Sequence, residues 1–154
     1  MERTATKPTI RRAVASDCPQ MLTLIEELAR FEKAPNAVTV TMEEFVTAGF
    51  GDHPVWEAFV AEVGDRIVGT AIFYVRYSTW KGRRLYLEDL IVTETMRGQG
   101  IGKLLFEATL TLCKERRYNG MVWQVLEWNE PALQFYKKYG ATFDGEWVNA
   151  AIEL

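Results

Sequence analysis

The sequence is poor in the residues that build disulfide frameworks, zinc sites and histidine-based catalytic centres. Its 154 residues include two cysteines, Cys18 and Cys113, and one histidine, His53. Two cysteines give no disulfide framework, and one histidine argues against a Cys/His zinc site and against any Ser-His-Asp triad not built on His53. Both cysteines fall on apolar faces of expected helices, so we expect buried, free thiols in a reducing cytoplasm.

Long apolar runs and a strong charge of either sign are also missing. No apolar stretch approaches the length of a membrane span, and the polar residues 1–8 lack the apolar core of a signal peptide. The formal net charge of −3 argues against general binding to nucleic acids or anionic membranes. A carboxylate-bound Mg²⁺ stays open, but no carboxylate spacing suggests one, so no metal is expected.

Length and hydrophobic pattern predict one domain, residues 1–154, of mixed α/β class. Strands are expected over residues 9–14, 56–63, 66–77, 84–92 and 121–128, with one or two closing strands in 142–154. Helices are expected from an Asp17 cap to Phe31, from a Thr41 capping box to Gly49, over about 100–117, and between Asn129 and Gly140. An early hairpin and a late β-α-β unit predict a mixed sheet.

A glycine-rich turn joins an expected strand to an expected helix. Its residues are Arg97, Gly98, Gln99, Gly100, Ile101, Gly102 and Lys103. Alternate glycines leave main-chain N–H groups unobstructed, and the helix N-terminus and two cations add positive charge. The turn therefore predicts a pyrophosphate site. Its glycine spacing fits neither the dinucleotide fingerprint nor the P-loop, and a turn without a ligand is the alternative.

Two adjacent carboxylates, Glu88 and Asp89, interrupt the apolar strand expected over residues 84–92. Burying them costs free energy unless one of them faces a polar cavity. Regular alternation along a strand sends them to opposite faces of the sheet. Two interpretations stay open, a functional carboxylate in a cavity or an outward-facing carboxylate on an edge strand.

Three motifs in order resemble the GNAT superfamily of acetyl-CoA-dependent N-acetyltransferases: the glycine turn, residues 127–131 (EWNEP) and residues 135–141 (FYKKYGA). Residues 50–54 (FGDHP), 77–83 (YSTWKGR) and 86–89 (YLED) look like the branch with spermidine/spermine and thialysine N-epsilon-acetyltransferases. Polyamine enzymes carry an acidic residue where Ser78 stands, whereas the thialysine type has the Ser-Thr-Trp-Lys-Gly pattern. The resemblance therefore favours a lysine-like amine.

The resemblance also implies a fold and a chemistry. The GNAT fold is a mixed, mostly antiparallel twisted sheet with a splayed central pair of parallel strands and flanking helices. A primary amine attacks the thioester of acetyl-CoA directly, without an acyl-enzyme, and no metal takes part. Relatives are homodimers, so a homodimer is expected.

The resemblance assigns roles to particular residues. It implies that coenzyme A is held by Leu90, Ile91, Val92, the turn from Arg97 to Lys103, Asn129, Ala132 and Tyr136. A main-chain N–H near Leu90 is the expected donor to the thioester oxygen, and a bulge is expected in that strand. Tyr136 matches the general acid that protonates the leaving thiolate, although an isolated tyrosine there also fits the core.

Glu88 is the candidate base, acting directly or through a water. The residues expected around the amine are Phe31, Glu32, Trp80, Glu88 and Asp89. Trp80 is equally explained as a hairpin-end aromatic, and Glu32 as a solvated charge. We therefore interpret the chain as an enzyme that transfers the acetyl group of acetyl-CoA to a small primary amine such as thialysine. Alternatives are a polyamine or diamine, a protein or peptide amine, or a non-catalytic acyl-CoA-binding module.

Overall fold

The computed structural model describes residues 7–154, which form two compact units, residues 7–124 and Val125–Leu154. The first unit contains a five-stranded sheet in the order β1-β2-β3-β4-β5. Its strands are β1 (Thr9–Arg12), β2 (Glu57–Val63), β3 (Arg66–Ser78), β4 (Gly82–Val92) and β5 (Met121–Trp123). The pairs β1–β2, β2–β3 and β3–β4 are antiparallel, and β5 is parallel to β4. The predicted mixed sheet is confirmed.

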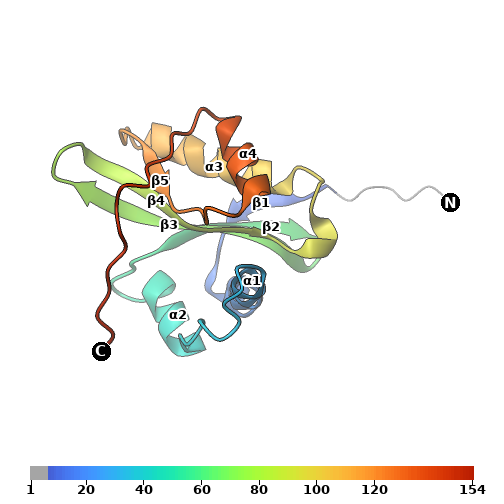
Figure 1. Ribbon diagram of the computed structural model, residues 1–154. Coiled ribbons are helices and arrows are strands. Elements are labelled where there is room, and N and C mark those ends of the chain that lie inside the picture. Colours follow the sequence, from blue (N-terminus) through green and yellow to red (C-terminus); the bar gives the residue numbers. More distant parts are fainter. Residues whose placement is uncertain (1–6) are drawn as a thin grey trace. The chain divides into compact units, whose positions relative to one another are not determined.

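Helices cover both faces of this sheet. α1 (Cys18–Phe31) and α2 (Met42–Phe50) lie on one face, and α3 (Ile101–Glu115) lies on the other (Figure 1). Two short 3₁₀ turns, Ala15–Asp17 and Glu94–Met96, precede α1 and α3. All three helices lie within two residues of their expected bounds, because their apolar positions repeat with helical period.

The two predicted caps in this unit behave differently. The Thr41 hydroxyl accepts a hydrogen bond from the Glu44 N–H at 3.1 Å, as a capping residue does. Asp17 directly precedes α1 but makes no capping bond to it. Its carboxylate instead accepts hydrogen bonds from the Arg11 guanidinium at 2.7 and 2.9 Å and from the Val14 N–H. The predicted side-chain cap is therefore wrong, because a bidentate arginine occupies both oxygens.

The apolar core lies against both faces of the sheet. On the α1 and α2 face, Trp56 stacks on Phe45 with ring centroids 4.7 Å apart. On the α3 face, a β-carbon at Gly69 would lie only 3.0 Å from Leu105, so glycine lets helix and sheet approach closely. Cys18 and Cys113 are buried and free, as predicted.

Two strand predictions are wrong. β5 ends at Trp123 rather than at residue 128, and residues 142–154 form no strand. Within Val125–Leu154 the regular element is the helix α4 (Glu130–Lys137). A strand exists only through hydrogen bonds to a neighbouring strand, and this unit supplies none of its own. The prediction for α4 itself is confirmed, since Asn129 Oδ1 accepts from the Ala132 N–H at 3.3 Å and Gly140 follows the helix at φ 76°.

Candidate functional site

The glycine turn has the backbone of an anion-binding loop. Gly98 and Gly100 have φ of 77° and 81°, in the left-handed region that disfavours other residues. Nothing lies within 4 Å of a β-carbon added at either position, so backbone conformation and not crowding requires glycine there. Gly102 lies inside α3 and has no such requirement. Since no side chain caps the start of α3, its first N–H groups remain available for an anion.

The cations of this turn are held differently. Arg97 Nε donates to the carbonyl of Val92 at 3.0 Å, and the guanidinium lies 5.2 Å from the centre of the Phe31 ring. Lys103 is exposed on the first turn of α3. Arg97 is therefore fastened to the end of β4 and to α1. Phe31, expected beside the amine, lies next to this cation.

Pairing between β4 and β5 stops after three residues. The last pair is Leu87 with Trp123. Within residues 7–124, no strand pairs with the β5 side of β4 beyond that point. The open stretch includes Leu90, Ile91 and Val92, which the resemblance assigns to coenzyme A. Pairing stops where β5 ends, so the edge of β4 at these three residues has no strand partner within residues 7–124.

A β-bulge in β4 decides where the two adjacent carboxylates point. Ile72 pairs with Asp89 and Phe73 pairs with Leu87, so Glu88 is an extra residue in β4. An extra residue breaks the alternation of side chains along a strand. Glu88 and Asp89 therefore both lie on the α1 and α2 face. The expectation that they would occupy opposite faces is wrong, whereas the expected bulge is confirmed.

The bulge gathers negative charge. Burial, followed by the charges of Glu88 and Glu32, raises the pKa of Asp89 to about 7. Burial also raises the pKa of Glu32, at the C-terminal end of α1. Within residues 7–154, no lysine or arginine forms an ion pair with these three carboxylates. We call Glu32, Glu88 and Asp89 the acidic cluster. A positively charged ligand would relieve its repulsion.

Two tyrosines for which the sequence predicted no role, Tyr74 and Tyr86, adjoin the acidic cluster. The Tyr74 hydroxyl donates to Glu88 Oε2 at 2.9 Å, and burial and then Glu88 raise the pKa of Tyr74. Tyr74 faces Tyr86 across the hairpin, with stacked rings 5.2 Å apart. The signal for Tyr86 was its position two residues before Glu88, which puts both side chains on one face.

Trp80 does not join this group. It lies at the tip of the β3–β4 hairpin with 87% of its surface exposed. The tip begins four residues beyond Tyr74, about 14 Å along the strand. Ser78, which stands where polyamine enzymes have an acid, accepts hydrogen bonds from the N–H groups of Trp80 and Lys81 at 3.2 and 3.1 Å. Its hydroxyl therefore shapes the turn.

The remaining expected residues belong to the second unit. Asn129 caps α4 through the Ala132 N–H, and Tyr136 is a buried residue of the same helix. The Tyr136 ring meets the Phe135 ring edge to face at 5.3 Å. The role of Tyr136 as the general acid stays a prediction.

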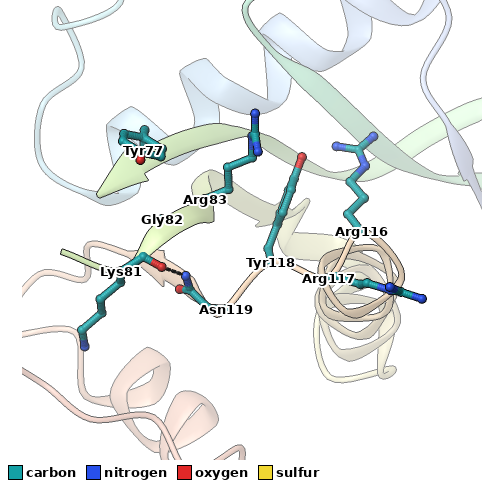
Figure 2. Close-up of a pocket in the computed structure, with 8 residues that line it drawn as sticks. All are labelled: Tyr77, Lys81, Gly82, Arg83, Arg116, Arg117, Tyr118 and Asn119. Atoms are coloured by element: carbon teal, nitrogen blue, oxygen red, sulfur yellow. Dashed lines mark hydrogen bonds between the residues drawn. The ribbon is translucent and has the colours of Figure 1, made fainter. Parts of the chain in front are cut away.

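A pocket of about 610 Å³ lies at the opposite end of α3 from the glycine turn. Its lining includes four cations, yet they do not converge: Arg83 and Arg116 flank Tyr118, while Lys81 and Arg117 point away (Figure 2). Arg116 is also held by Glu57 at 2.7 Å. This pocket contains none of the expected site residues.

The described part of the chain has no membrane-spanning helix and no group of three metal-ligating side chains. Between residues 7 and 154, each helix is too short or too polar to span a bilayer. Over the same residues, no three side chains of histidine, cysteine, aspartate or glutamate lie close enough to share a metal ion.

Comparisons with known proteins agree with this geometry. The profile of the acetyltransferase (GNAT) family matches residues 20–141. Thialysine N-epsilon-acetyltransferase of Bos taurus is 38% identical over 140 residues, which are 86% of this chain and 82% of that protein. The Homo sapiens spermidine/spermine N(1)-acetyltransferase-like protein 1 is 37% identical over 86% of this chain, but this stretch is only 20% of the human protein.

The solved structures extend the likeness in fold. An aminoglycoside acetyltransferase from an uncultured soil metagenomic sample matches with a TM-score of 0.79 over 99% of both chains. Its sequence is 24% identical, so this match concerns architecture alone.

Proposed function

Because the chain belongs to the GNAT family of acetyltransferases, acetyl-CoA-dependent enzymes that acetylate amines, we propose that its acceptor is a small, lysine-like primary amine such as thialysine. The observation that carries the proposal is the acidic cluster at the β4 bulge. It gathers three carboxylates without a cationic partner of their own among residues 7–154. An ammonium group is the ligand that such a cluster attracts.

The amine must lose a proton before it attacks the thioester carbon. In our proposal Glu88 and Asp89 take this proton as a coupled pair, directly or through a water. A carboxyl group whose pKa lies near 7, as that of Asp89 does, can accept and release a proton at neutral pH. Tyr74 holds Glu88 in place by its hydrogen bond. Glu32 adds attraction for the cation.

Other residues would handle the second substrate. The N–H groups between Gly98 and Lys103 would bind the diphosphate of acetyl-CoA, and the open edge of β4 at residues 90–92 would bind its pantetheine arm. A main-chain N–H near Leu90 would stabilise the developing oxyanion. As the carbon–sulfur bond breaks, Tyr136 would give its proton to the thiolate, with Asn129 and Ala132 contacting the cofactor. These assignments follow the family resemblance.

The wider setting is also proposed. We infer a single working domain and a cytoplasmic homodimer without nucleic-acid or membrane partners. A polyamine or diamine is the second candidate substrate, supported by the 37% identity to the spermidine/spermine N(1)-acetyltransferase-like protein. Ser78 in place of an acidic residue favours the lysine-like amine.

An amine panel tests the proposal. Release of free coenzyme A thiol from acetyl-CoA is measured with thialysine, lysine, spermidine, putrescine and a lysine-containing peptide, compared by kcat/KM. We expect thialysine to give the highest value. We also expect Tyr136→Phe to lose most of its turnover while its affinity for acetyl-CoA stays nearly unchanged. Unchanged turnover would remove Tyr136 from the mechanism, and a panel led by the peptide would contradict the substrate class.

A further inference from the structure

Two arginines face each other on the hairpin that carries the acidic cluster. Arg76 of β3 is directly opposite Arg84 of β4. Like charges at opposite positions of an antiparallel pair destabilise the pairing. Within residues 7–154, neither guanidinium forms an ion pair with a carboxylate. Both guanidinium groups are therefore without a carboxylate partner among these residues.

Arg84 carries a second sign of a missing partner. Its Nε atom is buried and has no hydrogen-bond partner in the part of the chain that the structure describes. Buried donors in native proteins are nearly always paired. A β-carbon at Gly120 would lie 2.4 Å from this guanidinium, so glycine makes room for it.

These arginines share a face with the acidic cluster. The pair Tyr74 and Tyr86 separates them, and side chains two residues apart on a strand point the same way. The guanidinium of Arg76 lies 5.5 Å from the centre of the Tyr86 ring, which confirms its side of the sheet. In order along the hairpin, the face presents carboxylates, two stacked tyrosine rings and the Arg76 guanidinium, while the Arg84 guanidinium lies against Gly120, on the β5 side of β4.

The position of the Arg76 guanidinium fits one kind of amine. By register Arg76 lies three to four residues from Glu88, roughly 10 to 14 Å along the strand. Its guanidinium, however, lies 5.5 Å from the centre of the Tyr86 ring, and Tyr86 is only two residues, roughly 7 Å, from Glu88. In lysine and thialysine, six bonds join the reacting nitrogen to the carboxyl carbon, which is also roughly 7 Å when extended. Arginine binds carboxylates in a planar, two-bond geometry that suits this end.

We propose that Arg76, assisted by Arg84, binds a carboxylate on the far end of the amine substrate, so that the site selects amino acids over diamines. The inference rests on the proposed function and specifies its substrate class as an amine that also carries a carboxylate. The same arginines repel the second ammonium of a polyamine, so selection includes a repulsive part.

Matched substrates and a matched control test the inference. Thialysine is compared with the diamine that lacks only its carboxylate, and with 6-aminohexanoate, which keeps a carboxylate without an α-amino group. In Arg76→Ala, kcat/KM for thialysine and 6-aminohexanoate falls about 10- to 100-fold, mainly through KM. The value for the diamine rises or changes less than threefold. Arg66→Ala, at the other end of β3, changes none of these values.

The outcomes distinguish failure of the carboxylate site from failure of the proposed function. Unchanged kinetics with thialysine in Arg76→Ala, or equal losses with thialysine and the diamine, would overturn the carboxylate site. If the wild-type protein acetylates the diamine but not thialysine, the inference fails and amine acetylation stands. If no amine releases coenzyme A, the proposed function fails. In that case calorimetric titration with thialysine still tests the Arg76 site. The Arg76→Ala variant must bind thialysine at least tenfold more weakly than the wild type does.

Discussion

Glu57 and Asp89 are partly buried carboxylates of the same sheet with opposite surroundings. Glu57, on β2, accepts hydrogen bonds from Arg116 at 2.7 and 2.8 Å and from Arg12 at 2.8 Å. Hydrogen bonding from Arg116 is the largest cause that lowers the Glu57 pKa to about 2. Asp89, on β4, has two other carboxylates nearby, and burial is the largest cause that raises its pKa to about 7.

The different surroundings of Glu57 and Asp89 indicate a structural role for the first carboxylate and a chemical role for the second. Around Glu57, arginines from β1 and from the end of α3 fasten the sheet to a helix. The same chain leaves the carboxylates at the β4 bulge without such partners within residues 7–154. Strongly perturbed carboxyl groups that have no structural partner are typical of functional sites. The comparison therefore predicts that Glu57 acts on stability and Asp89 on turnover.

The largest expected effect is the loss of activity when the acidic cluster is neutralised. In the double variant Glu88→Gln with Asp89→Asn, kcat/KM for the amine should fall about 100-fold or more, because no carboxylate at the bulge can accept its proton. The affinity for acetyl-CoA, measured by titration, should change less than threefold. Glu57→Gln is the control, and its kcat/KM should equal that of the wild type at a temperature where both are folded. Equal losses of kcat/KM in the double variant and in Glu57→Gln would contradict the proposed difference between the two sites.

Removing the paired carboxylate should cost stability. Glu57→Gln should lower the free energy of unfolding at pH 7 by about 2 kcal/mol. Because the folded pKa of about 2 lies below the ordinary 4.5, this stabilisation is complete above pH 4.5 and disappears as the pH falls toward 2. Urea unfolding at pH 7, 4 and 3 measures the difference between variant and wild type. A difference that stays constant with pH would contradict the ion-pair explanation.

Removing the Asp89 carboxylate, which has no arginine partner among the described residues, should raise the free energy of unfolding by less than Glu57→Gln lowers it. Since the folded pKa of Asp89 is about 7 against an ordinary 3.8, the folded protein holds a proton there that the unfolded chain releases. Wild-type stability therefore falls as the pH rises through this window. Asp89→Asn should gain about 1 to 2 kcal/mol at pH 8 and nothing at pH 4. Thermal unfolding at both values measures it, and a loss of stability at pH 8 would show that the Asp89 charge is compensated.

Local features of the fold were predictable from the sequence. The Thr41 and Asn129 caps, the glycine turn and the bounds of α3 depend on residues within one or two helical turns. Short-range hydrogen bonds and φ preferences act the same way in any context. The Asp17 cap failed because Arg11, on a neighbouring strand, offered its carboxylate stronger bonds.

The candidate site was predictable only in its residue types. Glu88 and Asp89 could be identified, but their common face follows from a bulge that depends on the register between β3 and β4. Arg76 and Arg84 are unremarkable in the sequence and become a pair only through the same register. The end of β5 at Trp123 is likewise set by pairing with β4.

By itself, the sequence determined the order of the elements from β1 to α4, the left-handed glycines at positions 98 and 100, and the supply of carboxylates in the middle of β4. Only the tertiary structure decided which charges meet: Glu57 with arginines, Asp89 with other acids, and Arg76 with Arg84. Capping and turn energies are settled within a few neighbouring residues. The register of a sheet joins residues far apart in the chain, and a shift of one residue moves a side chain to the other face.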